Sequence, residues 1–147
     1  MRPIFETTLD MSIEREIALA YAAHYHLRPV KRPALAVYDY DMLSAISDRA
    51  ITRIEIKGRK PEYKGFIESG GYMLSAKKFD ALKKLHGDVP VGLVVVFTNS
   101  PDMHVFYFSP HKVEDLKPVI GGRTRKKRDR QDIEHVVYIP WDRFVTI

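Results

Sequence analysis

The chain has 147 residues and a net charge of +5, and its 45% hydrophobic and 11% aromatic residues are enough for the core of one ordinary domain. It contains no cysteine, which excludes disulfides and thiolate metal sites and fits a reducing compartment. No apolar run approaches membrane-spanning length and no signal-peptide core is present, so we expect a cytoplasmic protein without a membrane partner.

The first part of the chain predicts a helix followed by an antiparallel hairpin. Apolar residues recur at helical spacing over residues 10–26, and the two prolines that follow are expected to close this helix. Residues 34–46 and 50–57 have strand-like patterns on either side of a short turn at 47–49. We therefore expect these two strands to pair with each other.

The rest of the chain predicts a second helix and a buried strand. The continuous apolar run VGLVVVF is typical of a central strand that is covered on both faces. The expected elements are a glycine- and charge-rich connector at 58–71, a helix capped by Ser75 and ended by Gly87, strands at 91–97, 103–109 and 136–139, and a packed end with Trp141 and Phe144. The fold class is therefore α/β, a single domain over residues 1–147 with a mixed β-sheet flanked by helices.

Residues 52–57 (TRIEIK) form the most informative segment. Strand side chains alternate between faces, so the isoleucines lie on one side and Glu55 and Lys57 on the other. A divalent cation bound by the carboxylate, with the ammonium facing a phosphate or an attacking water, explains this pair. The alternative is a solvated ion pair on an edge strand.

Two further acids precede this strand. Asp39 and Asp41 are two residues apart, so they share a strand face, and the expected hairpin brings them close to Glu55 and Lys57. Unpaired carboxylates repel one another, and bound Mg²⁺ removes the repulsion because it takes oxygen ligands. Asp39, Asp41 and Glu55 are therefore candidate metal ligands, the alternative being that one aspartate only caps the strand.

This set of residues resembles the PD-(D/E)XK nuclease superfamily, in which an acid in one strand precedes an Asp/Glu-x-Lys in the next. Glu55 and Lys57 match the Glu-x-Lys as they stand. Asp39 best matches the single acid and Asp41 is its rival, while Tyr38 stands where a proline is usual.

The flanking helices of the superfamily also have counterparts here. Glu14 fits the acid of the preceding helix better than Glu16, because it is nearer the apolar stripe of that helix. The run SAKK resembles the Ser-x-x-Lys of small phage-type members and indicates Lys78. The tail QDIEHVVYIP is similar to the end of small phage-encoded nuclease-like proteins, so the resemblance covers roughly residues 10–141.

The resemblance implies a restriction-endonuclease-like core and an Mg²⁺- or Mn²⁺-dependent nuclease, with DNA the favoured substrate. Asp39 and Glu55 would hold the metal, and Glu14 would be an outer or second-metal ligand. Lys57 would orient the attacking water or offset charge on the phosphoryl oxygens. Two alternatives stay open, a non-catalytic nucleic-acid-binding module and a phage assembly protein with the same fold. The oligomeric state is open too, a homodimer included, and a phage-encoded chain would act in a bacterial host.

The net positive charge is concentrated in residues 121–130 (GGRTRKKRDR), because the rest of the chain has 18 basic and 18 acidic residues and is neutral. Such a stripe suits a nucleic-acid backbone, the alternative being a solvated loop. The expected nucleic-acid contacts are Arg59, Lys60, Lys64, Lys78, Arg123, Arg125, Lys126, Lys127, Arg128 and Arg130. All six histidines, His24, His26, His86, His104, His111 and His135, are expected to be structural or surface residues.

Overall fold

The computed structural model describes residues 8–33, 35–98, 100–121 and 134–147. The elements in chain order are α1 (Thr8–Tyr25), β1 (Leu27–Lys31), β2 (Tyr40–Ser44), β3 (Ala50–Arg59), α2 (Tyr63–Gly70), β4 (Tyr72–Ser75), α3 (Ala76–Leu85), β5 (Val91–Phe97), β6 (Met103–Tyr107), α4 (Pro110–Val113), β7 (Val119–Gly121), β8 (Glu134–Ile139), the 3-10 turn η2 (Trp141–Arg143) and β9 (Val145–Thr146). None of the helices formed by these residues has the length and hydrophobicity that a membrane-spanning helix needs.

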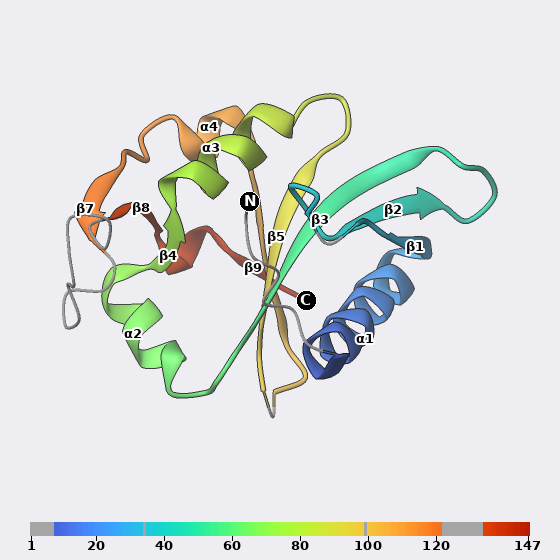
Figure 1. The fold of residues 1–147 in the computed structure, drawn as a ribbon, viewed down its shortest axis with the longest axis horizontal. Coiled ribbons are helices and arrows are strands. Elements are labelled where there is room, and N and C mark those ends of the chain that lie inside the picture. Colours follow the sequence, from blue (N-terminus) through green and yellow to red (C-terminus); the bar gives the residue numbers. More distant parts are fainter. Residues whose placement is uncertain (1–7, 34, 99, 122–133) are drawn as a thin grey trace.

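A mixed six-stranded sheet in the order β1-β2-β3-β5-β6-β9 forms the centre of the structure. Its β3 and β5 run parallel, whereas the other neighbours are antiparallel. A smaller sheet has the order β4-β8-β7. Figure 1 shows α1 on one side of the large sheet, with α2, α3 and the small sheet on the other. The expected fold class, a single α/β domain with a mixed sheet flanked by helices, is confirmed.

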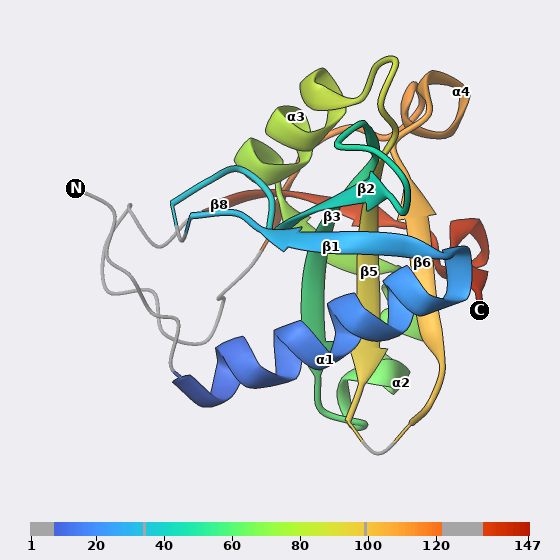
Figure 2. The same cartoon turned by 90° about the vertical axis from the view of Figure 1, so that its right-hand side faces the viewer.

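The helix α1 covers one face of the large sheet, across which it runs in Figure 2. Ile17 and Tyr21 of this helix belong to one buried cluster with Ile54 and Ile56 of β3 and Val94 of β5. The side chains of β3 therefore alternate between the two faces of the sheet as the sequence predicts. The isoleucines fill the core under α1, and the residues between them face the other way.

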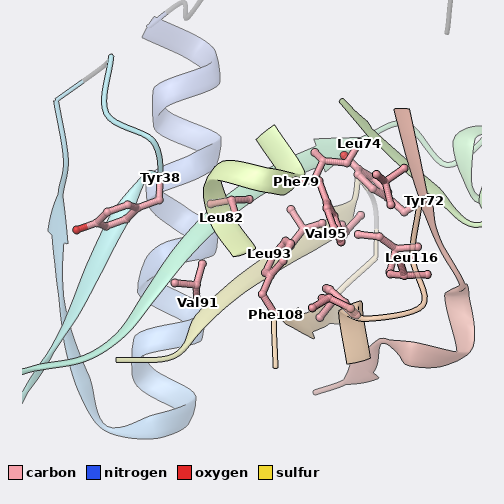
Figure 3. Close-up of a cluster of buried hydrophobic side chains, with 14 of the residues drawn as sticks. Tyr38, Tyr72, Leu74, Phe79, Leu82, Val91, Leu93, Val95, Phe108 and Leu116 are labelled. Atoms are coloured by element: carbon pink, nitrogen blue, oxygen red, sulfur yellow. The ribbon is translucent and has the colours of Figure 1, made fainter. Parts of the chain in front are cut away.

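The opposite face of the large sheet packs against α3 and the small sheet. Tyr72, Phe79, Leu82, Leu93 and Val95 belong to this second buried cluster, which Figure 3 shows in close-up. Because Leu93 and Val95 belong to this cluster while their neighbours in β5 face α1, β5 is buried on both sides, as its apolar run predicts.

Several expected elements are confirmed. The structure contains the helix expected at 10–26, the antiparallel hairpin, the buried strand β5, its partner β6 and the last strand β8. Ser75 caps α3 as expected, because its Oγ accepts a hydrogen bond from the backbone N–H of Lys78 at 3.1 Å. Trp141 and Phe144 pack against the second cluster.

The chain between the first helix and the hairpin differs from the expectation. The helix ends before His26, which has a left-handed φ of 57°, and the prolines do not end it. Residues 27–31 then form β1, which pairs with β2. Pro29 is compatible with this strand because β1 lies at the edge of the sheet. The strand expected at 34–46 is shorter, since β2 begins only at Tyr40.

The expected connector at 58–71 was also wrong in part, because it contains α2 and leads directly into β4. The glycines of this segment and the short length of both elements hide them from pattern analysis. Gly71 joins α2 to β4 with a φ of +91°, and a Cβ atom there would lie 2.6 Å from the carbonyl oxygen of Ile139. The short elements α4, β7 and β9 are not predicted either.

Candidate active site

Asp39, which is half-buried, and Glu55, which is buried, form a carboxylate pair. The backbone N–H of Asp39 donates to the carbonyl oxygen of Ile54 at 3.0 Å, which extends the ladder of β2 and β3 and sets Asp39 beside Glu55. The Oδ2 of Asp39 accepts a hydrogen bond from the backbone N–H of Ile56 at 2.7 Å. Glu55, opposite it, is only 2% exposed.

The two carboxylates of this pair repel each other when both are ionised. Burial, followed by the charge of Glu55, raises the pKa of Asp39 to about 8, and Glu14 adds a smaller effect in the same direction. The backbone N–H of Ile56 acts the other way but does not compensate. Burial and a neighbouring negative charge both disfavour the ionised form of Asp39, so its neutral form is favoured over a wider pH range than in an exposed aspartate.

Two lysines face the pair from different elements. The Nζ of Lys78, in the first turn of α3, lies 3.0 Å from Oε2 of Glu55, and the Nζ of Lys57 lies 3.6 Å from the same oxygen. Lys78 also donates a hydrogen bond to the carbonyl oxygen of Val37 at 2.7 Å. The Ser75 cap fixes the start of α3, and thereby the direction from which Lys78 approaches Glu55.

Glu14 approaches from α1. Its Oε1 lies 2.6 Å from Nζ of Lys31, and its side chain is mostly buried. Glu14 lines a cleft of about 530 Å³ together with Lys57, Arg59 and Lys60. Glu16 is exposed on the same helix. The geometry thus favours Glu14 over Glu16 as the helix acid near the pair.

The comparisons with known proteins agree with this fold. Residues 1–147 match the family described as "Phage putative PDDEXK endonuclease". The chain belongs to this PDDEXK family. The expected resemblance to the PD-(D/E)XK superfamily is therefore confirmed. No curated protein matches the chain.

A solved structure described as "Structure of D212, a nuclease from a fusselovirus" is similar to this PDDEXK chain. The TM-score is 0.51 at 15% sequence identity, and the similarity covers 97% of this chain and 89% of that chain. At this identity the similarity concerns the fold, which extends over almost the whole of both chains.

Asp41 does not join the carboxylate pair, so of the two or three acids expected to cluster, the structure brings together Asp39 and Glu55. Asp41 lies opposite Arg53 in the hairpin and accepts a hydrogen bond from the Tyr38 hydroxyl at 2.6 Å. Arg32 and Arg53 both lie 3.8 Å from its carboxylate. Among the described residues, no group of three or more His, Asp or Glu side chains is close enough together to hold a metal ion.

The predicted basic contacts of the PDDEXK chain lie in different places. Arg59 lines the cleft with its guanidinium over the rings of Tyr63 and Tyr72, at 5.6 and 5.7 Å from their centroids. Lys60 lines the cleft and is exposed, and Lys64 is exposed on α2. Six expected contacts, Arg123, Arg125, Lys126, Lys127, Arg128 and Arg130, lie outside the described residues.

Sequence reasoning did not single out Lys31, Arg32 or Arg53. Arg53 could have been found, because it continues the alternation of charged residues in β3 that also includes Glu55, Lys57 and Arg59. These four side chains belong to the face of β3 that points away from the isoleucines. The other two residues follow a helix end that the sequence pattern misplaces, so no signal placed them near the site.

Proposed function

We propose that the protein is a metal-dependent nuclease that hydrolyses phosphodiester bonds of nucleic acid, with DNA the favoured substrate. The observation that carries the proposal is the carboxylate pair of Asp39 and Glu55, with Lys57 and Lys78 both within 4 Å of one Glu55 oxygen. Membership of the PDDEXK family and the nuclease description of the similar structure support it.

The donor set of the pair fits Mg²⁺ or Mn²⁺. Both acids offer carboxylate oxygens, which hard divalent cations take as ligands. Burial and the charge of Glu55 raise the pKa of Asp39, and a bound cation would oppose both effects by favouring the ionised carboxylate. Asp39 and Glu55 would hold the ion, with Glu14 as an outer or second-metal ligand. When bound, it would polarise the phosphate and acidify a water ligand.

The side chains around the pair suit separate roles. Lys57 is part of the cleft wall, so its ammonium can orient the attacking water or offset charge that develops on the phosphoryl oxygens. Lys78 is more buried and contacts Glu55 directly, so it would position that carboxylate. Arg59 and Lys60 line the same cleft and would bind backbone phosphates, as would the exposed Lys64.

The test is cleavage of labelled linear, circular and branched DNA, and of RNA, in Mg²⁺, in Mn²⁺ and in chelator. We expect products with either metal and none with chelator, and Glu55→Gln should remove them. Lys57→Ala should lower turnover while leaving Mn²⁺ affinity largely unchanged. A pure wild-type protein that binds nucleic acid but cuts none under any of these conditions would favour the non-catalytic binding module.

A further inference from the structure

A second charged cluster lies next to the carboxylate pair, and metal binding by that pair gives this cluster no role. This arginine cluster consists of Arg32, Tyr38, Asp41 and Arg53. Asp41 lies opposite Arg53 on the antiparallel strands, one step along the same faces from Asp39 and Glu55. Tyr38 belongs to the buried cluster on the α3 side of the sheet, and Figure 3 shows it there. The arginine cluster therefore adjoins the candidate active site.

The two guanidiniums are held in place mainly by an aromatic ring. Arg32 lies 5.4 Å and Arg53 5.8 Å from the centroid of the Tyr38 ring, within the range of cation–π contacts. The Tyr38 hydroxyl donates to Asp41, which lies 3.8 Å from each arginine, beyond hydrogen-bonding distance. Asp41 and Tyr38 thus orient the arginines without satisfying their donors.

The arginine pair lacks an acceptor. Within the described part of the chain, neither guanidinium donates a hydrogen bond to the protein, and the Nε atoms of both are buried without a partner. One carboxylate faces two cations, so the cluster has an excess of positive charge. The side chains of Arg32 and Arg53 are nevertheless 42% and 30% exposed, so a ligand can reach part of each from solvent. The missing partner is an anion.

The neighbourhood identifies the anion as a phosphate. A guanidinium has planar, paired donors that match phosphate oxygens. Arg32 and Arg53 together could bind one phosphate group from two sides. Residues two apart in a strand are separated by about 6.6 Å, so Arg53 lies only about one or two nucleotides of backbone from Glu55. A nucleic-acid strand at the carboxylate pair would present its next phosphates here.

We propose that Arg32 and Arg53 form a phosphate-binding subsite for the nucleic-acid strand, adjacent to the phosphate that is cut. The subsite rests on the proposed nuclease function, since it assumes that the cut bond lies at Asp39 and Glu55. Asp41 and Tyr38 are positioning residues of this subsite, and Asp41 is not a metal ligand.

Binding without turnover tests the subsite. Affinity for a fluorescent oligonucleotide is measured by anisotropy over a range of salt concentrations, in chelator and in Ca²⁺. Each arginine that neutralises a phosphate contributes about 0.7 to 0.9 to the slope of log affinity against log salt. We expect Arg53→Gln and Arg32→Gln each to flatten the slope by about that amount, and Lys84→Gln to leave it unchanged. Lys84 is a suitable control because its side chain is 77% exposed and lies beside Asp80 on the surface of α3.

A second variant separates binding from folding. Arg53→Lys keeps the charge but loses the planar donor pair, so the salt slope should stay near the wild-type value while affinity falls a few-fold. Melting curves of all variants are recorded beside the binding data. Slopes for both glutamine variants equal to that of Lys84→Gln would overturn the subsite.

Modified oligonucleotides identify which phosphate is bound. A single methylphosphonate removes one backbone charge, and at the right position it should weaken binding of wild type but not of Arg53→Gln. If instead only removal of the 5′-phosphate has this effect, the subsite holds a strand end. A flattened slope together with an inactive wild type would support phosphate binding by the two arginines, but would overturn the nuclease and with it the position of the subsite beside a cut bond. Cleavage with unchanged slopes, or no binding to any nucleic acid in either condition, would overturn the subsite.

Discussion

The ammonium of Lys78 lies 3.0 Å from Oε2 of Glu55, although the two residues come from different layers of the structure. Glu55 belongs to a central strand and Lys78 to the first turn of α3. The pair thus ties the candidate catalytic strand to the helix that covers it. Because the Glu55 side chain is 3% exposed, this contact has a large influence on the carboxylate.

Lys78→Met should therefore reduce both stability and turnover. The change leaves Glu55 with only the more distant Lys57, and a buried charged group that loses a partner costs about 1–3 kcal/mol of unfolding free energy. Lys77→Met is the matched control, because its side chain is exposed on the same helix turn. Urea denaturation and cleavage rates measure the two effects. Equal behaviour of the two variants would show that Lys78 does not position Glu55.

The two aspartates of the hairpin should differ in metal binding. Asp39→Asn removes the carboxylate that lies beside Glu55 on the neighbouring strand, so we expect Mn²⁺ affinity measured by calorimetry to fall at least tenfold. Asp41→Asn changes a carboxylate that faces Tyr38 and two arginines, and Mn²⁺ affinity should remain within about twofold of wild type. The reverse pattern would return Asp41 to the list of metal ligands.

His104 should make the protein less stable in mild acid. Burial lowers the pKa of His104 below its usual value of 6.5, an effect that Asp102 opposes and Lys64 assists. The unfolded chain therefore binds more protons than the folded one as the pH falls through 6.5, and the unfolding free energy decreases. His104→Gln should weaken this pH dependence in denaturation curves, while His111→Gln, on the surface, should not.

Two adjacent glycines should respond differently to alanine. Gly71→Ala places a Cβ 2.6 Å from the carbonyl oxygen of Ile139 at a φ of +91°, so we expect a loss of about 1–3 kcal/mol. Gly70→Ala meets nothing within 4 Å and should be neutral or slightly stabilising. Melting temperatures compare the variants directly. A Gly71→Ala protein as stable as wild type would mean that the joint between α2 and β4 can shift.

The sequence predicted the elements that have a long or regular pattern. The alternation in β3, the apolar run of β5 and the Ser75 cap of α3 each have a local cause that the chain carries in itself. The elements that it did not predict, such as β1 and β4, are short and depend on a partner elsewhere in the chain. Pairing of β4 with β8 joins residues more than sixty positions apart, and no local pattern encodes it.

The candidate site was predictable in part for the same reason. Asp39, Glu55 and Lys57 follow from strand periodicity, and the Glu-x-Lys spacing pointed to them. The two aspartates share a face as expected, but their neutralising partners differ. Whether a metal or an arginine lies beside Asp41 depends on the position of Arg32. Arg32 directly follows β1, a strand that the sequence pattern did not indicate.

The charged side chains of β3 form a row on one face of the strand, because every second residue carries one. The row consists of Arg53, Glu55, Lys57 and Arg59. Inserting or deleting one residue within this strand would turn the residues beyond it toward α1 and bring isoleucines into the site. The exposed turn at 45–49 carries no such restriction. Among natural relatives, length changes should therefore accumulate in that turn, while the spacing from Arg53 to Arg59 stays fixed.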